Sequence, residues 1–498
     1  MASLKTKTAR SLKWNIIDKV STQVLYAITG IVLARELSQE DFGLVGAVLI
    51  FQAFASLLVD SGFSFALLQR RRPSRLDYST VLWFNLGVAA VLYVGVWFAA
   101  PLIADIFQGD RRLIPLTRAM FVALPLNAAA IVQANRLMKA MDVRMIAASN
   151  SLGLAVGGAT GIALAISGFG AWAIVAQTIA IAAVKSLVLW TTSRWRPLAR
   201  FSWTSLRSFF GLGSKMMLSS FLNTVFQNLY SFFIGNRVNL TALGYYSQSE
   251  KWSRMGTASL SQVLTSSFVP ALSAVQNDPD RYRRLASKMT RFTAYLLFPA
   301  MLWLATVAKP LFHTLFGTKW DASVYLFQLL LFRGIFVVLN SLASNFLLGL
   351  GHGSDIVRQE ILRDVLAVVA LAVTFPYMTL STAADPVAGV AIMLWGQVIA
   401  TILTWLYTMA VTLRRLGSAP GTYVSDLAPY FCLTAITVPA MLGAAALVSA
   451  PYLKLAVEGA AALAIYIGIN AALGSKVQKE TFTYLRGAFA KNSSIKKA

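Results

Sequence analysis

Residues 80–104 read TVLWFNLGVAAVLYVGVWFAAPLIA, an apolar run without an Asp, Glu, Lys or Arg. At 1.5 Å per residue, a helix of this length crosses the hydrocarbon core of a bilayer, which is about 30 Å thick. No water reaches that core, so the backbone must satisfy its own hydrogen bonds, and a helix does this within one segment. The stretch therefore predicts a transmembrane helix in an all-α integral membrane protein.

The rest of the chain repeats this pattern. Of its 498 residues, 57% are hydrophobic and 13% are charged, whereas a soluble protein has about 25% charged residues. This composition excludes a soluble protein and leaves no room for a large domain outside the membrane. Apolar segments bounded by charges, Gly or Pro predict about fourteen spans, at 14–34, 43–68, 80–104, 115–134, 146–166, 172–192, 209–234, 243–268, 292–312, 324–348, 365–380, 386–413, 427–448 and 453–473.

The positive charge follows the predicted loops. The net charge is +24, from 44 Lys and Arg against 20 Asp and Glu. If the N-terminus is cytoplasmic and the spans alternate, most basic residues outside the spans fall on the cytoplasmic side, as Arg70–Arg72 and Arg281–Arg284 do. The positive-inside rule then predicts an even number of spans with both termini in the cytoplasm. It also explains the charge without a nucleic-acid partner, and the first apolar stretch is predicted to be an uncleaved span.

Motifs for cofactors, metals and catalysis are missing from the sequence. Gly211-Leu212-Gly213-Ser214-Lys215 lacks the spacing of a nucleotide-binding P-loop. The two histidines, His313 and His352, fall at opposite membrane faces and cannot share a metal. The single cysteine, Cys432, excludes an intramolecular disulfide and is interpreted as a small core residue. We therefore predict no cofactor, no metal and no catalytic residue.

A weak internal repeat appears when the chain is shifted by 201 positions. Leu33-Ala34 then falls on Ile234-Gly235, and Phe42-Gly43 falls on Leu243-Gly244. Many transporters consist of two such repeats around a central site. We expect two six-helix lobes related by pseudo-two-fold symmetry, at 1–200 and 201–415, followed by two further spans at 416–473 and a basic cytoplasmic tail at 474–498.

Polar residues inside the spans gather on faces related by this repeat. Asn223, Gln227 and Tyr230 have the spacing i, i+4, i+7, so they share one helix face. At the same offset they fall on Thr22, Tyr26 and Thr29. Two matching polar faces indicate a water-filled cavity between the lobes. The alternative is interhelical hydrogen bonding in a packed bundle.

Charged residues inside the spans are more often basic than acidic. Each costs about 2.5–3.5 kcal/mol at the centre of a span, and Glu250 and Arg254 are spaced to form a pair. An excess of cations suits an anionic passenger such as a pyrophosphate, although structural pairing is the alternative. The predicted substrate-binding residues are Lys251, Arg254, Arg333, Lys215, Arg118, Asn223, Gln227 and Tyr26, and the candidate ion-coupling carboxylates are Asp18, Asp60 and Glu250.

Several short motifs together resemble the polysaccharide exporters of the multidrug/oligosaccharidyl-lipid/polysaccharide (MOP) superfamily. The resemblance is greatest to the colanic-acid-exporter-like branch of the Wzx-type flippases, and it extends over most of the chain. The motifs are Ser11-Leu12-Lys13-Trp14, Val32-Leu33-Ala34-Arg35 with Phe42-Gly43, Asp60-Ser61-Gly62-Phe63 with Leu68-Gln69-Arg70, Phe268-Val269-Pro270-Ala271-Leu272 and Leu315-Phe316-Gly317-Thr318-Lys319-Trp320.

This resemblance implies a flippase rather than an enzyme. Its substrate would be an undecaprenyl-diphosphate-linked oligosaccharide repeat unit, moved across the bacterial inner membrane by alternating access for exopolysaccharide or lipopolysaccharide synthesis. Expected partners are this lipid-linked oligosaccharide, membrane lipids, a driving proton or sodium ion, and the polysaccharide polymerase and glycosyltransferases. The family has no invariant catalytic motif, so the candidate site residues depend on the polar and charged patterns above.

Two alternatives belong to other functional classes. A multidrug or cation antiporter of the same superfamily would favour carboxylates in its cavity, because its passengers are usually cationic. A membrane-embedded enzyme of glycan assembly would need catalytic residues on a large outer loop, and no such loop is predicted. A flippase of peptidoglycan precursors is a close variant of the leading hypothesis.

Overall fold

The computed structural model describes residues 4–60, 62–193, 195–381, 385–446, 448 and 451–480, and these residues are almost entirely helical. By their contacts they form two compact units, Met1–Ser247 (unit 1) and Gln248–Ala498 (unit 2). The all-α class predicted from the apolar runs is confirmed. The boundary predicted after residue 200 was based on the repeat of 201 positions, whereas the division by contacts falls after Ser247.

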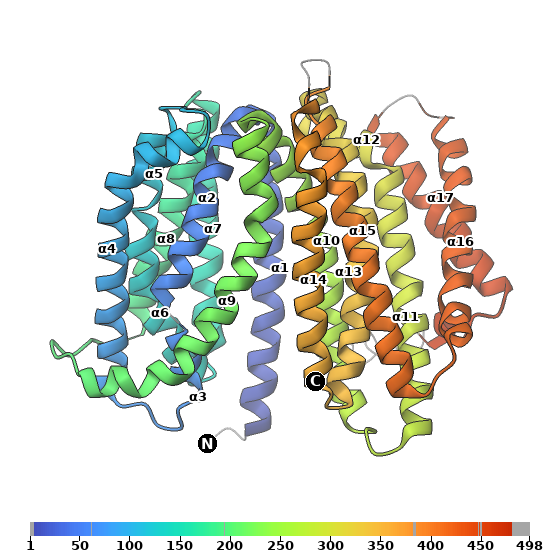
Figure 1. Cartoon of the computed structure of the whole chain (residues 1–498), viewed down its shortest axis with the longest axis horizontal. Helices are drawn as coiled ribbons and strands as arrows, with labels where there is room; N and C mark the ends of the chain where they lie inside the picture. Colours follow the sequence, from blue (N-terminus) through green and yellow to red (C-terminus); the bar gives the residue numbers. More distant parts are fainter. Residues whose placement is uncertain are drawn as a thin grey trace, which may run out of the picture. The chain divides into compact units, whose positions relative to one another are not determined.

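Unit 1 is a bundle in which most of the long helices run along one common direction and α9 crosses it obliquely (Figure 1). Its helices are α1 (Leu4–Glu36), α2 (Gln39–Asp60), α3 (Phe63–Gln69), α4 (Arg75–Ile106), α5 (Leu113–Met120), α6 (Ala123–Lys139), α7 (Val143–Ile166), α8 (Trp172–Thr192), α9 (Trp203–Arg237) and the first turns of α10 (Leu240–Ser273). Ser74 begins α4 with a capping box, in which its hydroxyl accepts from the Asp77 N–H at 3.1 Å and the Asp77 carboxylate accepts from the Ser74 N–H at 2.8 Å.

Glycines bring α7 and α8 together. A Cβ atom on Gly157 would lie 2.4 Å from the Ile181 side chain, and one on Gly153 would lie 3.1 Å from the Ile181 carbonyl oxygen. In a membrane, helices associate by close packing because lipid is as apolar as their side chains. Gly153, Gly157 and Gly161 therefore serve the packing role that their spacing of four residues predicts.

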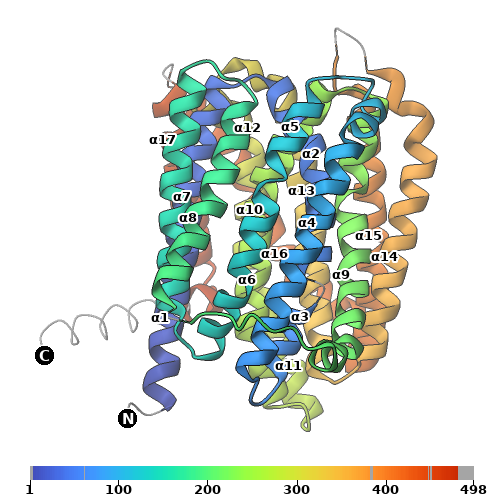
Figure 2. The same cartoon turned by 90° about the vertical axis from the view of Figure 1, so that its left-hand side faces the viewer.

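Unit 2 contains the rest of α10 and the helices that follow it. These are α11 (Pro279–Thr306), α12 (Ala308–Phe316), the 3₁₀ turn η1 (Thr318–Trp320), α13 (Asp321–Gly349), α14 (Gly353–Thr374), the 3₁₀ turn η2 (Phe375–Leu380), α15 (Ala388–Leu416), α16 (Pro420–Ala446) and α17 (Pro451–Ala472). Within the unit, α15 packs on both α13 and α14, and α16 packs on both α11 and α17. Figure 2 shows these helices and those of unit 1 from a second side.

Hydropathy identifies most of the predicted spans. Among the described residues, eleven helices are long and apolar enough to cross a membrane, and a twelfth span exists if α11 and α12, bent by 65°, are one span. The remaining two long helices, α9 with 35 residues and α10 with 34, do not meet the same test. Their length is sufficient, but their polar and charged residues lower their hydropathy. The chain is a multi-pass membrane protein, and the number fourteen stays a prediction.

Three predicted spans contain more than one helix in the structure, and one of the three is sharply bent. Within the span at 43–68, α2 ends at Asp60 and α3 begins at Phe63, and Gly62 between them has a φ of 69°. The span at 115–134 is split between α5 and α6, and the span at 292–312 bends where α11 meets α12. Uniform apolarity does not reveal such breaks, because side chains on both sides of a bend are equally hydrophobic.

The predicted repeat has a counterpart in the packing of unit 1. A Cβ atom on Gly43 of α2 would lie 1.8 Å from the carbonyl oxygen of Leu240, and one on Gly244 of α10 would lie 1.9 Å from the carbonyl oxygen of Gln39. Each residue of one contact is 201 positions from its counterpart in the other. Two helices that cross reciprocally in this way are related by a local two-fold axis, as two repeats of the same fold require.

Candidate functional site

The row of polar residues on α1 is partly open in unit 1. Tyr26 is 45% exposed, Thr22 is half-buried and Thr29 is buried. The Thr29 hydroxyl donates to the Leu25 carbonyl oxygen at 2.8 Å within its own helix. The N-terminal part of this row, at Thr22 and Tyr26, is therefore accessible to a ligand. Its C-terminal residue, Thr29, is buried and serves helix packing.

In the matching row on α9, the exposure of the side chains also decreases toward the C-terminal end of the row. Asn223 and Gln227 are exposed, and Tyr230 is 2% exposed. Lys215, two turns before Asn223, is also exposed. Because α9 is one continuous helix over this stretch, the i, i+4, i+7 spacing does place Asn223, Gln227 and Tyr230 on one face. The two repeat-related rows thus open toward the exterior of unit 1 at their N-terminal ends.

These exposed polar residues need a polar environment. Figure 1 shows α4 at one edge of unit 1 and α1 at the opposite edge, with α9 running obliquely across the bundle. Where α4 is exposed, it presents apolar residues such as Val91 and Phe98, as a helix facing lipid does. Polar and charged residues at membrane depth face water or protein rather than acyl chains. The exposed parts of α1 and α9 are mixed, because Val20 and Val24 of α1 and Leu218 of α9 are exposed beside the polar residues. A wet path along the polar rows stays a prediction.

Asp18 lies in a polar network between α1 and α7. Its carboxylate accepts from the Asn150 amide at 3.3 and 3.4 Å and from the Thr22 hydroxyl at 3.4 Å. One turn along, the hydroxyls of Ser21 and Ser151 lie 3.0 Å apart. Lys185 of α8 also interacts electrostatically with Asp18. The role of Asp18 in ion coupling stays a prediction.

Asp60 lies at the break between α2 and α3. Its carboxylate accepts a hydrogen bond from the Ser64 hydroxyl, and that hydroxyl in turn accepts from the Asn135 amide of α6 at 2.7 Å. These bonds connect the end of α2 to α6 and fix the start of α3. Its ion-coupling role stays a prediction, and its observed contacts are those of a helix-end brace.

Arg118 lies apart from the other candidate cations of unit 1. It belongs to α5, at the end of the unit opposite the N-terminus of α1 (Figure 1). Its guanidinium lies 4.7 Å from the Trp97 ring centre, and its Nε donates to the Trp97 carbonyl oxygen at 3.1 Å. These contacts with α4 account for an arginine at this position without a ligand.

In unit 2, α10 has a charged turn. Glu250 and Arg254 form the ion pair predicted from their spacing. Lys251 lies with its ammonium 5.5 Å from the ring centre of Trp252, and this ring packs on Phe316 of α12. The Arg254 side chain is 53% exposed, so its guanidinium can bind a further anion while it remains paired with Glu250.

Arg333 of α13 belongs to the same region of unit 2. Its Nε donates to the Thr401 hydroxyl of α15 at 3.1 Å. The adjacent Gly334 lies against α10, since a Cβ atom there would be 2.4 Å from the Thr257 side chain. Thr257 follows Arg254 by about one helical turn. The helices of Arg333 and Arg254 therefore contact each other at Gly334 and Thr257, while the Arg333 guanidinium contacts α15.

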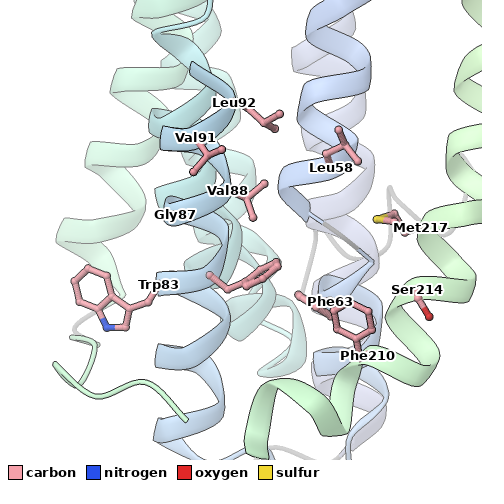
Figure 3. A pocket seen from close by; sticks show the side chains of 11 residues that line it. Leu58, Phe63, Trp83, Gly87, Val88, Val91, Leu92, Phe210, Ser214 and Met217 are labelled. Carbon is pink, nitrogen blue, oxygen red and sulfur yellow. The ribbon is translucent and has the colours of Figure 1, made fainter. Parts of the chain in front are cut away.

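The cavity drawn in Figure 3 is not part of this polar region. It lies in unit 1 between α2, α3, α4 and α9 and has a volume of about 520 Å³. Its lining is apolar apart from Ser214, and Phe63 and Phe210 pack together at its lower end with ring centres 6.1 Å apart. Such a cavity can hold an apolar chain, but it offers no partners for a sugar or a diphosphate.

Sequence reasoning missed the partners supplied by other helices. Asn150 and Ser151 on α7, Lys185 on α8 and Thr401 on α15 complete the polar networks around the candidate residues. Each is a polar residue within an apolar segment, and this polarity was the one feature of the sequence that could have identified them. Their association with Asp18 or Arg333 depends on helix packing, which hydropathy does not reveal.

Comparison with known proteins identifies relatives over most of the chain. A family model described as polysaccharide biosynthesis protein matches residues 32–325. The succinoglycan biosynthesis transport protein ExoT of Rhizobium meliloti is 27% identical over 74% of this chain and 74% of its own length. The lipopolysaccharide biosynthesis protein WzxC of Escherichia coli is 25% identical over 67% of this chain and 68% of its own length.

A solved structure shares the fold. The lipid II flippase MurJ, in an inward closed conformation, superposes with a TM-score of 0.69 over 93% of this chain and 99% of its own, at 12% identity. The predicted resemblance to Wzx-type polysaccharide proteins is confirmed by the family model and the curated relatives. The prediction of a transporter rather than an enzyme is confirmed as well, since ExoT is named as a transport protein.

Proposed function

The chain belongs to the polysaccharide biosynthesis protein family, and on that premise we propose that it flips undecaprenyl-diphosphate-linked oligosaccharide repeat units across the bacterial inner membrane. In this proposal the polar faces of α1 and α9 in unit 1 contact the saccharide, the basic residues of α10 in unit 2 contact the diphosphate, and the polyprenyl chain stays in lipid. Both termini lie in the cytoplasm in this proposal, and the product serves exopolysaccharide or lipopolysaccharide synthesis.

The observation on which the proposal depends is the polarity of these helices. Asn223 and Gln227 of α9 and Arg254 of α10 are exposed, and α9 and α10 are the two long helices that do not meet the hydropathy test for a span. A saccharide requires hydroxyl and amide partners, and a diphosphate requires cations that donate charge-assisted hydrogen bonds. Unit 1 offers amides on α9, and unit 2 offers guanidiniums on α10 and α13, so each unit carries one of these two kinds of partner.

The function is tested by reconstitution. The full chain is incorporated into vesicles with a lipid-linked saccharide whose sugar bears a fluorophore that dithionite bleaches from outside. We expect dithionite to bleach the probe of both leaflets in vesicles with the protein, and the outer leaflet alone in vesicles without it. A phosphatidylcholine with the same fluorophore is the control for leakage and unspecific scrambling. Bleaching confined to the outer leaflet in both preparations would rule out the function.

The coupling ion is a separate prediction. We propose that Asp18, Asp60 or Glu250 exchanges a proton or sodium ion during the cycle, and the loose network around Asp18 makes it the first of these to test. Flipping is expected to slow when an imposed proton or sodium gradient is collapsed by an ionophore. Asp18→Asn is expected to leave a rate that no longer responds to the gradient. A wild-type rate unaffected by either gradient would contradict ion coupling.

A further inference from the structure

A second cavity lies in unit 2. It has a volume of about 540 Å³ and is lined by α11, α13, α15, the turn after α15, and α16. No residue of α10 lines it. It lies at the end of the unit where α11 and α16 begin and α15 ends (Figure 1). The predicted topology places this end at the cytoplasmic surface of the membrane.

The lining of this cavity has two chemically distinct parts. Its basic residues, Arg283, Arg284, Lys288 and Arg291, all belong to the first turns of α11. Its apolar part is formed by Ala286, Phe346, Met409, Leu413 and Leu416. The basic side chains are close to half exposed or more, whereas Phe346 and Met409 are buried. The cavity therefore combines a cationic mouth with an apolar interior.

The charges at this mouth are only partly neutralised. Arg283 pairs with Asp280 at 2.5 Å and donates to the Gly417 carbonyl oxygen at 3.3 Å, and Lys288 pairs with Glu480 at 2.7 Å. Arg284 is exposed and forms no ion pair with any residue that the structure describes. The guanidiniums of Arg283 and Arg284 can therefore be shared with a ligand at the surface.

One acid lies deeper in the cavity, where it positions the basic residues. Asp426 is 7% exposed. Its carboxylate accepts from the Ser287 hydroxyl at 2.5 Å and lies 3.6 Å from the Arg291 Nε, a distance beyond hydrogen-bond length. Asp426 is the one acid in the lining and is matched by Arg291, and Asp280 and Glu480 pair with Arg283 and Lys288 from outside the lining. Arg284 therefore leaves the mouth with a net positive charge.

We propose that this cavity binds an anionic phospholipid of the inner leaflet, such as phosphatidylglycerol. Its phosphate would lie between Arg283 and Arg284, and part of an acyl chain would lie against Leu413 and Phe346. Basic pockets between transmembrane helices at the cytoplasmic side bind such headgroups. The chain's own tail is not a suitable occupant, because residues 481–498 contain basic residues and no Asp or Glu.

The proposal is tested by native mass spectrometry of the purified full chain, titrated with phosphatidylglycerol and phosphatidylcholine. Each surface cation contributes about 1 kcal/mol to anionic lipid binding, or about fivefold in affinity. The double variant Arg283→Gln/Arg284→Gln is expected to bind phosphatidylglycerol about 25-fold more weakly, with phosphatidylcholine unchanged. The matched control is Arg71→Gln/Arg72→Gln, which removes two exposed arginines of unit 1.

A second pair of variants tests the apolar half of the cavity. Leu413→Trp fills it, whereas Leu406→Trp places the same side chain at an exposed position on the same helix. We expect the first to weaken phosphatidylglycerol binding at least fivefold and the second to leave it unchanged. This pair removes no charge and leaves the arginines in place. It therefore tests whether the lipid occupies the cavity even if the arginine variant fails to fold.

Three results would overturn the proposal. The first is an equal loss of phosphatidylglycerol binding in the cavity variants and their controls. That result would indicate that surface charge in general attracts the lipid. Another is displacement of the lipid by inorganic phosphate or pyrophosphate, which would indicate a site for a free anion. The last is tighter binding of undecaprenyl diphosphate to the same cavity, which would make it a passenger site. The proposed function does not depend on this lipid, so the flipping assay can succeed or fail independently.

Discussion

Replacing Gly43 or Gly244 by Ala is expected to abolish accumulation of folded protein in the membrane. The added Cβ atom would lie 1.8 Å from the Leu240 carbonyl oxygen in the first variant and 1.9 Å from the Gln39 carbonyl oxygen in the second. Both obstacles are backbone atoms, so no side-chain rotation relieves the overlap. The helices must separate, and the cost is expected to exceed the 1–3 kcal/mol that is typical of overpacking.

The measurement is the amount of monodisperse protein extracted from membranes, with export in cells as a second readout. Gly87→Ala and Gly95→Ala are matched controls, since no atom lies within 4 Å of a Cβ atom built at either position of α4. Both controls are expected to accumulate as the wild type does. Normal accumulation of the Gly43 and Gly244 variants would contradict the close crossing of α2 and α10.

Arg333→Ala and Lys251→Ala are expected to reduce export at least tenfold while the protein still inserts and accumulates. A charge-assisted hydrogen bond is worth about 1.5–3 kcal/mol, which corresponds to a factor of about ten or more in rate. Arg333→Ala also removes the hydrogen bond between the guanidinium and the Thr401 hydroxyl of α15. Export is measured in cells that lack the wild-type protein, beside the membrane level of each variant.

Conservative variants distinguish binding from structural support at these positions. Arg333→Lys retains the charge and should restore part of the export that Arg333→Ala loses. Thr401→Val removes the hydroxyl partner without altering the charge, and we expect it to have the smaller effect. Arg71→Ala is the control for loss of an arginine at an exposed loop position. Wild-type export in both alanine variants would remove Arg333 and Lys251 from the proposed path.

Much of the fold was predictable because bilayer physics is simple. Uninterrupted apolar runs such as residues 80–104 define spans with few alternatives. The repeat was also visible in the sequence, and the reciprocal contacts of Gly43 and Gly244 give it a structural meaning. By contrast, the bend where α11 meets α12 was not predicted, since a bend between two apolar helices leaves hydropathy unchanged.

The candidate site was only partly predictable for a related reason. Helical spacing correctly paired Glu250 with Arg254 and aligned Asn223 with Gln227, because both are relations within one helix. Relations between helices need the packed structure, and so the contacts of Arg118 with Trp97 and of Arg333 with Thr401 were missed. The interpretation of Cys432 as a core residue was wrong, because α16 exposes it. An apolar run in a membrane protein does not distinguish lipid-facing from core positions.

The central claim is that the polar faces of α1 and α9 contact water at membrane depth. Its most direct test uses a background in which Cys432, the single cysteine, is replaced by Ser, with new cysteines at Tyr26, Asn223 or Gln227. Val91→Cys and Val369→Cys are controls at exposed apolar positions of α4 and α14. We predict that a membrane-impermeant, positively charged thiosulfonate labels the first three and leaves the two controls unlabelled. Absence of label at all three polar positions, or equal labelling of the controls, would contradict the claim.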